Sequence, residues 1–148
     1  MKKLLATVIC AVCLLSLMSC ASHIEDTNGA ENTSLCSLTD EDIIDGTSSV
    51  AQKSVSNKRN DRGSMRIEKF SGVQLVDSMN VRDKAETLTC TVNLKSGNFR
   101  VVIVKDGKIF ADIKTDGTED SVTLTQSGKY ELKIAGESAN FEMEYKIK

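Results

Sequence analysis

Apolar and polar residues alternate along most of the chain after residue 64, and this alternation predicts β-strands. In the clearest run, Phe141–Lys148, every odd position is apolar and every even position is charged. Such a run is typical of a strand with one buried face and one face in water. The other predicted strands are Met65–Phe70, Val73–Val81, Leu88–Leu94, Phe99–Lys105, Lys108–Lys114, the run around Val122 and Leu124, and Tyr130–Ile134.

The dipeptide Asp106-Gly107 predicts a two-residue hairpin turn, because both residue types accept positive φ angles. In that register Val104 lies opposite Ile109, while Ile103 and Phe110 face each other on the other side. Both faces of the hairpin are partly apolar, so we expect it near the centre of the sheet.

Short strands separated by frequent turns, with no strong helical period, indicate an all-β fold. We predict a small antiparallel β-sandwich of about eight strands over residues 65–148. A small β-barrel is the alternative architecture.

The first twenty residues have a different pattern. Lys2 and Lys3 precede an apolar stretch from Leu4 to Met18, and Cys20 follows. This stretch is shorter than the roughly 20 apolar residues that span a bilayer. A basic start, a short apolar run and small residues at its end are typical of a cleaved export signal.

The segment Leu17-Met18-Ser19-Cys20 resembles the lipobox of bacterial lipoproteins. The resemblance implies that residues 1–19 are a signal peptide and that Cys20 becomes the N-terminus, carrying a diacylglyceryl lipid as its only attached group. Two acyl chains suffice for stable membrane attachment. The protein is then extracytoplasmic and anchored to a bacterial membrane. A secretory signal cut after Ala21 and a retained membrane helix are the alternatives.

Residues 20–64 are predicted to be a flexible polar tether beginning at the lipidated cysteine. No aromatic residue occurs between residues 21 and 64, and Ser, Thr, Asn, Asp and Glu dominate. Such a composition buries too little apolar surface to offset the entropy of ordering. One helical turn is expected over 39–44, with Thr39 as its N-cap. Four basic residues are expected to be solvated, with contact to anionic wall polymers or phospholipid headgroups as the alternative. They are Lys53, Lys58, Arg59 and Arg62.

Charge and histidine content exclude several function classes. The chain has 19 basic and 21 acidic residues and a formal net charge of −2, which argues against a nucleic-acid partner. The single histidine, His23, lies in the predicted tether. The predicted domain therefore holds neither a Ser-His-Asp triad nor a histidine zinc site.

Beyond Cys20, the predicted mature chain has Cys36 and Cys90. Export permits a disulfide between them. Cys90 lies on the apolar face of its strand, so a buried free thiol with a raised pKa is the competing interpretation.

Carboxylates provide two further candidate sites. A loop with a glycine can hold calcium through side-chain oxygens, but the spacing here does not match an EF-hand, so the calcium candidate is weak. Its residues are Asp112, Asp116, Glu119 and Asp120. A pair of carboxylates could also hydrolyse a glycosidic bond. Glu142 and Glu144 share one face of a strand, however, and are more simply explained as a solvated face with cross-strand charge pairs.

The segment 97–148 is similar to the small β-sandwich domains that end many short bacterial lipoproteins. The similarity is carried by Ser96-Gly97-Asn98-Phe99, the Asp106-Gly107 hairpin, the run Gly128–Leu132 and the closing strand Phe141–Lys148. It implies a fold and no activity.

We therefore expect a lipid-anchored envelope or cell-surface protein that displays a non-catalytic binding or structural domain, rather than an enzyme. Its partners would be the membrane, through the anchor, and a protein or wall polymer. A carboxylate-based extracytoplasmic hydrolase and an accessory subunit of a neighbouring membrane complex are the alternatives.

Overall fold

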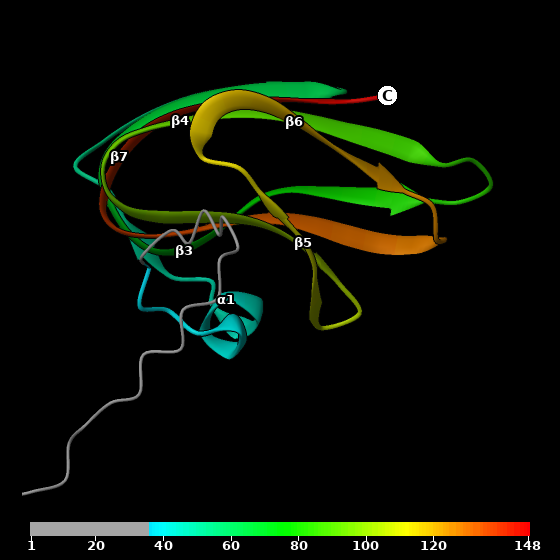
Figure 1. The fold of residues 1–148 in the computed structure, drawn as a ribbon, viewed down its shortest axis with the longest axis horizontal. Helices are drawn as coiled ribbons and strands as arrows, with labels where there is room; N and C mark the ends of the chain where they lie inside the picture. The colour runs from blue at the N-terminus through cyan, green and yellow to red at the C-terminus, as the bar shows by residue number, and fades with distance from the viewer. Residues whose placement is uncertain (1–35) are drawn as a thin grey trace, which may run out of the picture. The chain divides into compact units, whose positions relative to one another are not determined.

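Three strands of 20 residues each form the centre of the structure: β3 (Arg62–Val81), β4 (Glu86–Lys105) and β7 (Gly128–Ile147) (Figure 1). The computed structural model describes residues 36–148. β7 lies between β3 and β4, and every strand pairing is antiparallel. The remaining elements are α1 (Asp40–Asp45), β1 (Ser49–Val50), β2 (Lys53–Arg59), β5 (Lys108–Ile113) and β6 (Asp116–Leu124).

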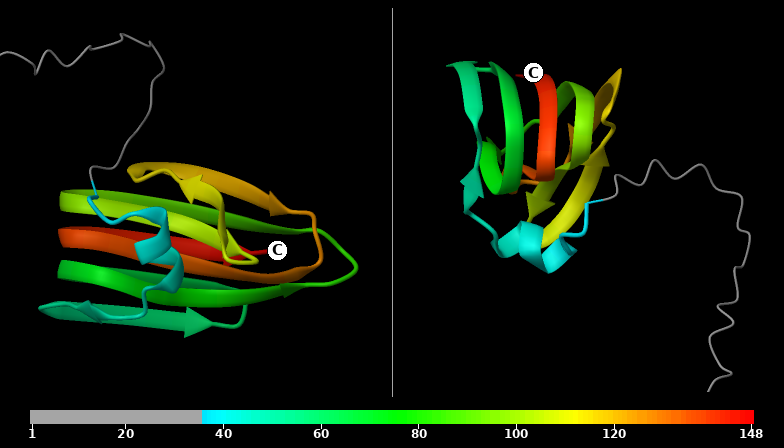
Figure 2. Two further views of the ribbon diagram at one scale, coloured as in Figure 1. Left: turned by 90° about the horizontal axis from the view of Figure 1, so that it is seen from below. Right: turned by 90° about the vertical axis from the view of Figure 1, so that its left-hand side faces the viewer.

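The long strands bend near their middles, so one sheet folds over on itself and forms two facing layers (Figure 2). The first layer holds β2, the first half of β3, the second half of β7, the first half of β4, and β6. The second layer holds β1 and the other halves of the three long strands, with β5 at its edge. α1 packs on the outer face of the second layer.

Bulges and aromatic packing explain the bend. The register between β4 and β7 shifts between Leu94 and Asn98, and Gly97 there has a φ of +83°. A Cβ on Gly97 would lie 2.5 Å from the carbonyl oxygen of Ser138, so only glycine fits. Phe99 and Phe141 stack at 3.9 Å inside the bend, and Phe70 meets both rings edge-on. This cluster fills the fold of the sheet.

The structure confirms the all-β antiparallel prediction. Residues 36–148 form seven strands, and five of them, β3 to β7, cover the region where about eight were predicted. Six of the predicted short strands merge in pairs into β3, β4 and β7, because each pair continues through the bend. The sheet stays open, since β5 and β6 pair only with β4. It therefore does not close into the alternative barrel.

The predicted boundary of the tether at residue 64 is wrong. Residues 36–64 belong to the folded unit and contribute α1, β1, β2 and the start of β3. Every residue of β2 pairs with β3, and this edge strand therefore needs no apolar residue to be held in place. Ile43 of α1 is fully buried. Residues 20–35 of the predicted tether lie outside the described residues. They include the predicted lipidation site Cys20 and the single histidine, His23.

The predicted helical turn is confirmed. α1 begins after Thr39, whose side chain accepts a hydrogen bond from the backbone N–H of Asp42, and the Asp42 carboxylate accepts one from the backbone of Thr39. This reciprocal capping box defines the start of the helix. Within residues 36–148, no helix has the length and apolar character required to cross a membrane.

Candidate functional site

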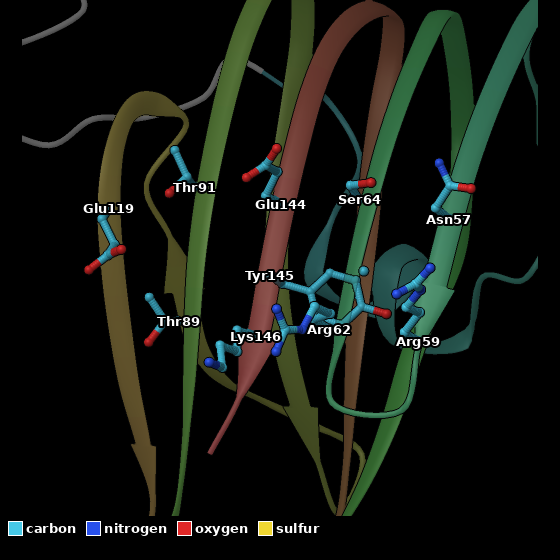
Figure 3. A pocket seen from close by; sticks show the side chains of 11 residues that line it. Asn57, Arg59, Arg62, Ser64, Thr89, Thr91, Glu119, Glu144, Tyr145 and Lys146 are labelled. Carbon is cyan, nitrogen blue, oxygen red and sulfur yellow. The ribbon is translucent and has the colours of Figure 1, made fainter.

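A polar groove crosses the outer face of the first layer (Figure 3). It has a volume of about 500 Å³ and is open to solvent. It runs across β2, β3, β7, β4 and β6, and a second hollow of about 360 Å³ continues it along the same face. The groove is lined by Asn57, Arg59, Arg62, Gly63, Ser64, Thr89, Thr91, Glu119, Glu144, Tyr145 and Lys146.

Strand alternation makes this face polar. Phe141, Met143 and Tyr145 of β7 are buried between the layers, and Glu144 and Lys146 therefore point outwards. The sequence predicts this arrangement, and the structure confirms it. Neighbouring strands place hydroxyl, amide and charged side chains beside them, because each strand has the same alternation.

Cross-strand pairing arranges the groove residues in two rows. Arg59 pairs with Arg62, Arg62 pairs with Lys146, and Lys146 pairs with Thr89. We call Arg59, Arg62 and Lys146 the cationic row. The second row lies two residues further along each strand, on the same face of the sheet. It consists of Asn57, Ser64, Glu144, Thr91 and Glu119.

Few of the charges in these two rows are neutralised within residues 36–148. Arg62 forms an ion pair with Asp61, with 3.4 Å between Nε and Oδ1, and this hydrogen bond lowers the pKa of Asp61. In this described part of the chain, ion pairs are recorded for neither Arg59 nor Lys146, and the same holds for Glu119 and Glu144.

A polar triad of two buried residues, Asp77 and Tyr145, and the exposed Lys58 lies behind the groove. The hydroxyl of Tyr145 donates a hydrogen bond to Asp77 at 2.9 Å, and the ammonium of Lys58 binds the other carboxylate oxygen at 2.5 Å. Burial alone would raise the pKa of Asp77, but hydrogen bonds from Lys58, the backbone of Ser78 and Tyr145 lower it. Burial and the hydrogen bond to Asp77 raise the pKa of Tyr145.

This triad is a structural contact that connects the edge strand β2 to the second layer. The raised pKa of Tyr145 keeps its hydroxyl group protonated at neutral pH, so it is a poor base. Both carboxylate oxygens of Asp77 already accept hydrogen bonds within the triad. Gly63 makes room for the ring, since a Cβ there would lie 2.4 Å from a ring carbon of Tyr145. The triad is not predicted from the sequence, because the polar composition around Lys58 is typical of a tether.

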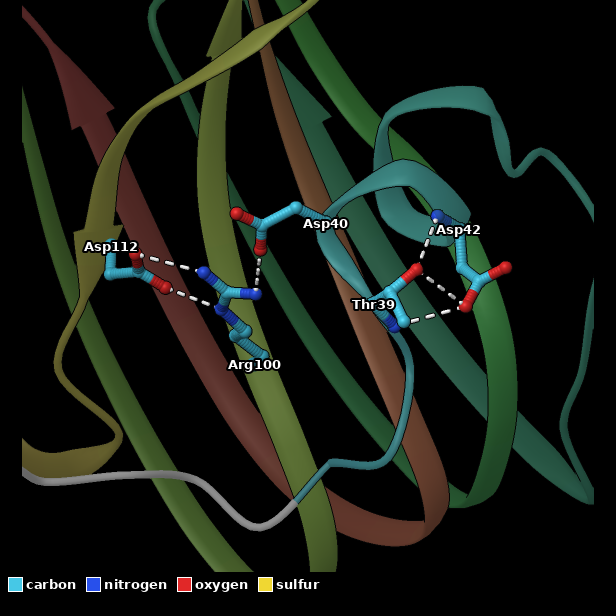
Figure 4. A network of polar contacts seen from close by, with 5 residues as sticks. All are labelled: Thr39, Asp40, Asp42, Arg100 and Asp112. Atoms are coloured by element: carbon cyan, nitrogen blue, oxygen red, sulfur yellow. Dashed lines mark hydrogen bonds and ion pairs between the residues drawn. The ribbon is translucent and has the colours of Figure 1, made fainter.

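A second polar network holds α1 on the opposite face (Figure 4). The guanidinium of Arg100 binds both carboxylate oxygens of Asp112, at 2.6 and 3.1 Å, and reaches Asp40 at 2.5 Å. The buried ammonium of Lys133 donates to the carbonyl oxygens of Ile43, Ile44 and Gly46 at the end of α1. These cations anchor α1 to the second layer.

Cys36 and Cys90 are both free thiols, so the structure contains no bridge between them. Cys90 is buried in the cluster between the layers, whereas Cys36 packs against the cluster beneath α1. The sheet therefore separates the two sulfur atoms. Burial, followed by the charge of Asp120, raises the pKa of Cys90 to about 12, as the buried-thiol interpretation expects.

The four carboxylates of the weak calcium candidate do not converge. Asp112 binds Arg100, Asp116 accepts hydrogen bonds from Thr118, and Asp120 accepts them from the backbone of Lys114 and Ser121. Glu119 lines the groove instead. No group of three or more potential metal ligands occurs within residues 36–148.

Comparison with known proteins adds no relative: no protein-family model matches the chain, and no curated protein matches its sequence.

Proposed function

We propose that this chain is a lipid-anchored envelope protein whose domain binds a hydrophilic ligand in the polar groove, without catalysis. The observation that carries the proposal is the groove itself, an open hollow of about 500 Å³ lined by hydroxyl, amide and charged side chains from five strands. A binding face on a rigid sheet loses little entropy when it meets its ligand.

The chemistry of the groove favours binding over hydrolysis. A general acid requires a carboxyl group whose pKa is raised in a desolvated pocket. Glu119 and Glu144 are exposed on an open face. The buried carboxylate, Asp77, is held ionised by Lys58 and Tyr145. These contacts support a non-catalytic role.

The anchor is tested by the intact mass of the protein purified from the cell envelope. We expect a chain that begins at Cys20 and carries a diacylglyceryl group, because of the lipobox-like segment before it. A chain that begins at Ser22 without lipid would contradict the anchor. The same sample, measured after alkylation without reduction, should show Cys36 unbridged.

The binding face is tested by a side chain that fills the groove. Thr91 is half-buried in the second row between Glu144 and Glu119, so Thr91→Trp should cover these two neighbours and abolish binding. We would measure retention of the detergent-purified protein on insoluble envelope material. Thr125→Trp, at an exposed position outside the groove, is the matched control. Equal retention of both variants and the native protein would overturn the proposed binding face.

A further inference from the structure

The cationic row is an unusual arrangement for a sheet surface. Arg59, Arg62 and Lys146 are direct cross-strand partners on three neighbouring strands. Like charges placed directly opposite each other destabilise a sheet. An anion bound between them would convert this repulsion into attraction.

Elsewhere on the same face, a carboxylate of the protein itself lies between two cations and neutralises them. Glu142 lies between Arg66 and Lys95, at 3.4 and 3.7 Å from their nitrogen atoms. The cationic row has one ion pair of its own, between Arg62 and Asp61, and no ion pair is recorded for Arg59 or Lys146 within residues 36–148. The two carboxylates of the groove, Glu144 and Glu119, lie in the second row, so the positive charge is concentrated along one side of the groove and the negative charge along the other.

The second row determines what surrounds the anion. Ser64, Thr91 and Asn57 offer hydroxyl and amide groups that both donate and accept hydrogen bonds. Glu144 and Glu119 in the same row accept hydrogen bonds and repel negative charge. A ligand is thereby oriented, with its negative group on the cationic row and its hydroxyl groups on the second row.

We propose that the groove binds an anionic glycan, whose carboxylate, sulfate or phosphate group lies on Arg59, Arg62 and Lys146. Guanidinium groups bind such oxyanions with paired hydrogen bonds. A sugar ring supplies the hydroxyl groups that match the second row. This inference rests on the proposed function, since it names the ligand class of the same groove.

A glycan fits this face better than an anionic membrane surface does. The two carboxylates of the second row would be pressed against lipid phosphates and repelled by them. The aromatic ring that lines the groove, Tyr145, is buried, so it cannot insert between headgroups. Two guanidinium groups and one ammonium group nevertheless bind any oxyanion, so the experiment includes vesicles and inorganic phosphate.

The test uses two matched pairs of probes and the full purified protein. The pairs are oligogalacturonate with its neutral methyl ester, and dextran sulfate with dextran. The variant R59Q/R62Q/K146Q removes the cationic row. The control R82Q/K84Q/K108Q removes three positive charges from exposed positions elsewhere. Affinity is measured by calorimetry at low and high salt.

We expect at least one anionic probe to bind at least tenfold more tightly than its neutral partner. Its affinity should fall at least tenfold in R59Q/R62Q/K146Q and at high salt, and should be unchanged in the control. Equal affinity for both members of each pair, or equal loss in the control variant, would overturn the inference. Tighter binding to phosphatidylglycerol vesicles or to inorganic phosphate than to either anionic glycan would also overturn it.

The outcome also separates this inference from the proposed function. If Thr91→Trp abolishes retention on envelope material while R59Q/R62Q/K146Q retains it, the groove is the binding face and the anionic-glycan assignment is wrong. If Thr91→Trp has no effect, the proposed binding face itself is wrong.

Discussion

Asp77 shows how one buried residue joins parts of the chain that are distant in sequence. Its carboxylate receives hydrogen bonds from Lys58 on β2 and from Tyr145 on β7. Removing one partner of such an ion pair destabilises the fold, because the remaining charge is left uncompensated. The triad therefore controls how firmly β2, and with it one wall of the groove, is held.

Replacing Asp77 with Asn should lower the free energy of unfolding by about 1–3 kcal/mol at pH 7, because the ion pair with Lys58 is lost and the hydrogen bond from Tyr145 is weakened. The folded-state pKa of Asp77 is lowered, so its contribution is present above the unfolded pKa of about 4 and is lost as pH falls through the folded pKa. The difference between native protein and Asp77→Asn should shrink towards acid pH. Urea titrations at several pH values measure this difference.

The matched control is Asp83→Asn, an exposed carboxylate in the turn before β4. It should leave the free energy of unfolding within about 0.5 kcal/mol of the native value. A pH-independent difference for Asp77→Asn would contradict the ion-pair account.

At the scale of the elements, the bend of the long strands is the feature that positions everything else. Gly97 allows β4 to pass from the first layer to the second against the backbone of Ser138. The bend also explains why two short predicted strands correspond to each long observed strand. Alternation identifies each straight half of a long strand, but it says nothing about whether the backbone pairing continues between two halves.

Gly97→Ala should destabilise the fold by about 2–4 kcal/mol, through a positive φ together with a steric clash. Gly107→Ala is the matched control, because Gly107 also has a positive φ but no atom within 4 Å of its added Cβ. It should cost about 1 kcal/mol, as expected from backbone conformation alone. Thermal or urea unfolding of both variants measures the difference. Equal losses would contradict the close approach at the bend.

α1 depends on Lys133, whose buried ammonium binds the carbonyl groups at the end of the helix. Lys133→Met should therefore loosen residues 36–46, because these carbonyls lose their donor while the sheet keeps its own pairing. Hydrogen exchange should rise at least tenfold in this segment and change little in β7. Lys129→Met, at an exposed position of β7, is the control. Unchanged protection of α1 would contradict this role.

How much of the structure the sequence predicts depends on the range of the contacts. The capping box of Thr39 and the wet face of β7 involve neighbours in the sequence, and both are confirmed. The Asp106-Gly107 hairpin also forms, and Val104 lies opposite Ile109 as predicted. A bulge then places Ile103 opposite Ala111 instead of Phe110, and β5 lies at an edge rather than at the centre.

Contacts between distant segments were not predictable in the same way. The tether prediction failed because composition reports apolar burial, whereas β2 is held by backbone pairing and by Lys58. The cationic row could be recognised only in part. Arg59 and Arg62 belong to the basic cluster noted in the sequence, but Lys146 joins them through the pairing of β3 with β7.

At the scale of the whole described domain, the two outer faces differ in kind. On the outer face of the second layer, α1 covers an apolar cluster and is held by Arg100 and Lys133. The outer face of the first layer is polar, open and hollowed. This asymmetry underlies the proposal that one face supports the N-terminal segment and the other binds ligand.

The central claim is that the polar groove binds an anionic glycan, and the most direct measurement is the map of backbone amide chemical shifts during titration with oligogalacturonate or dextran sulfate. The account predicts saturable changes concentrated at Arg59, Arg62, Lys146 and Thr89, with little change in α1 and β5. Changes concentrated on α1 and the second layer, or none with either polymer, would contradict it.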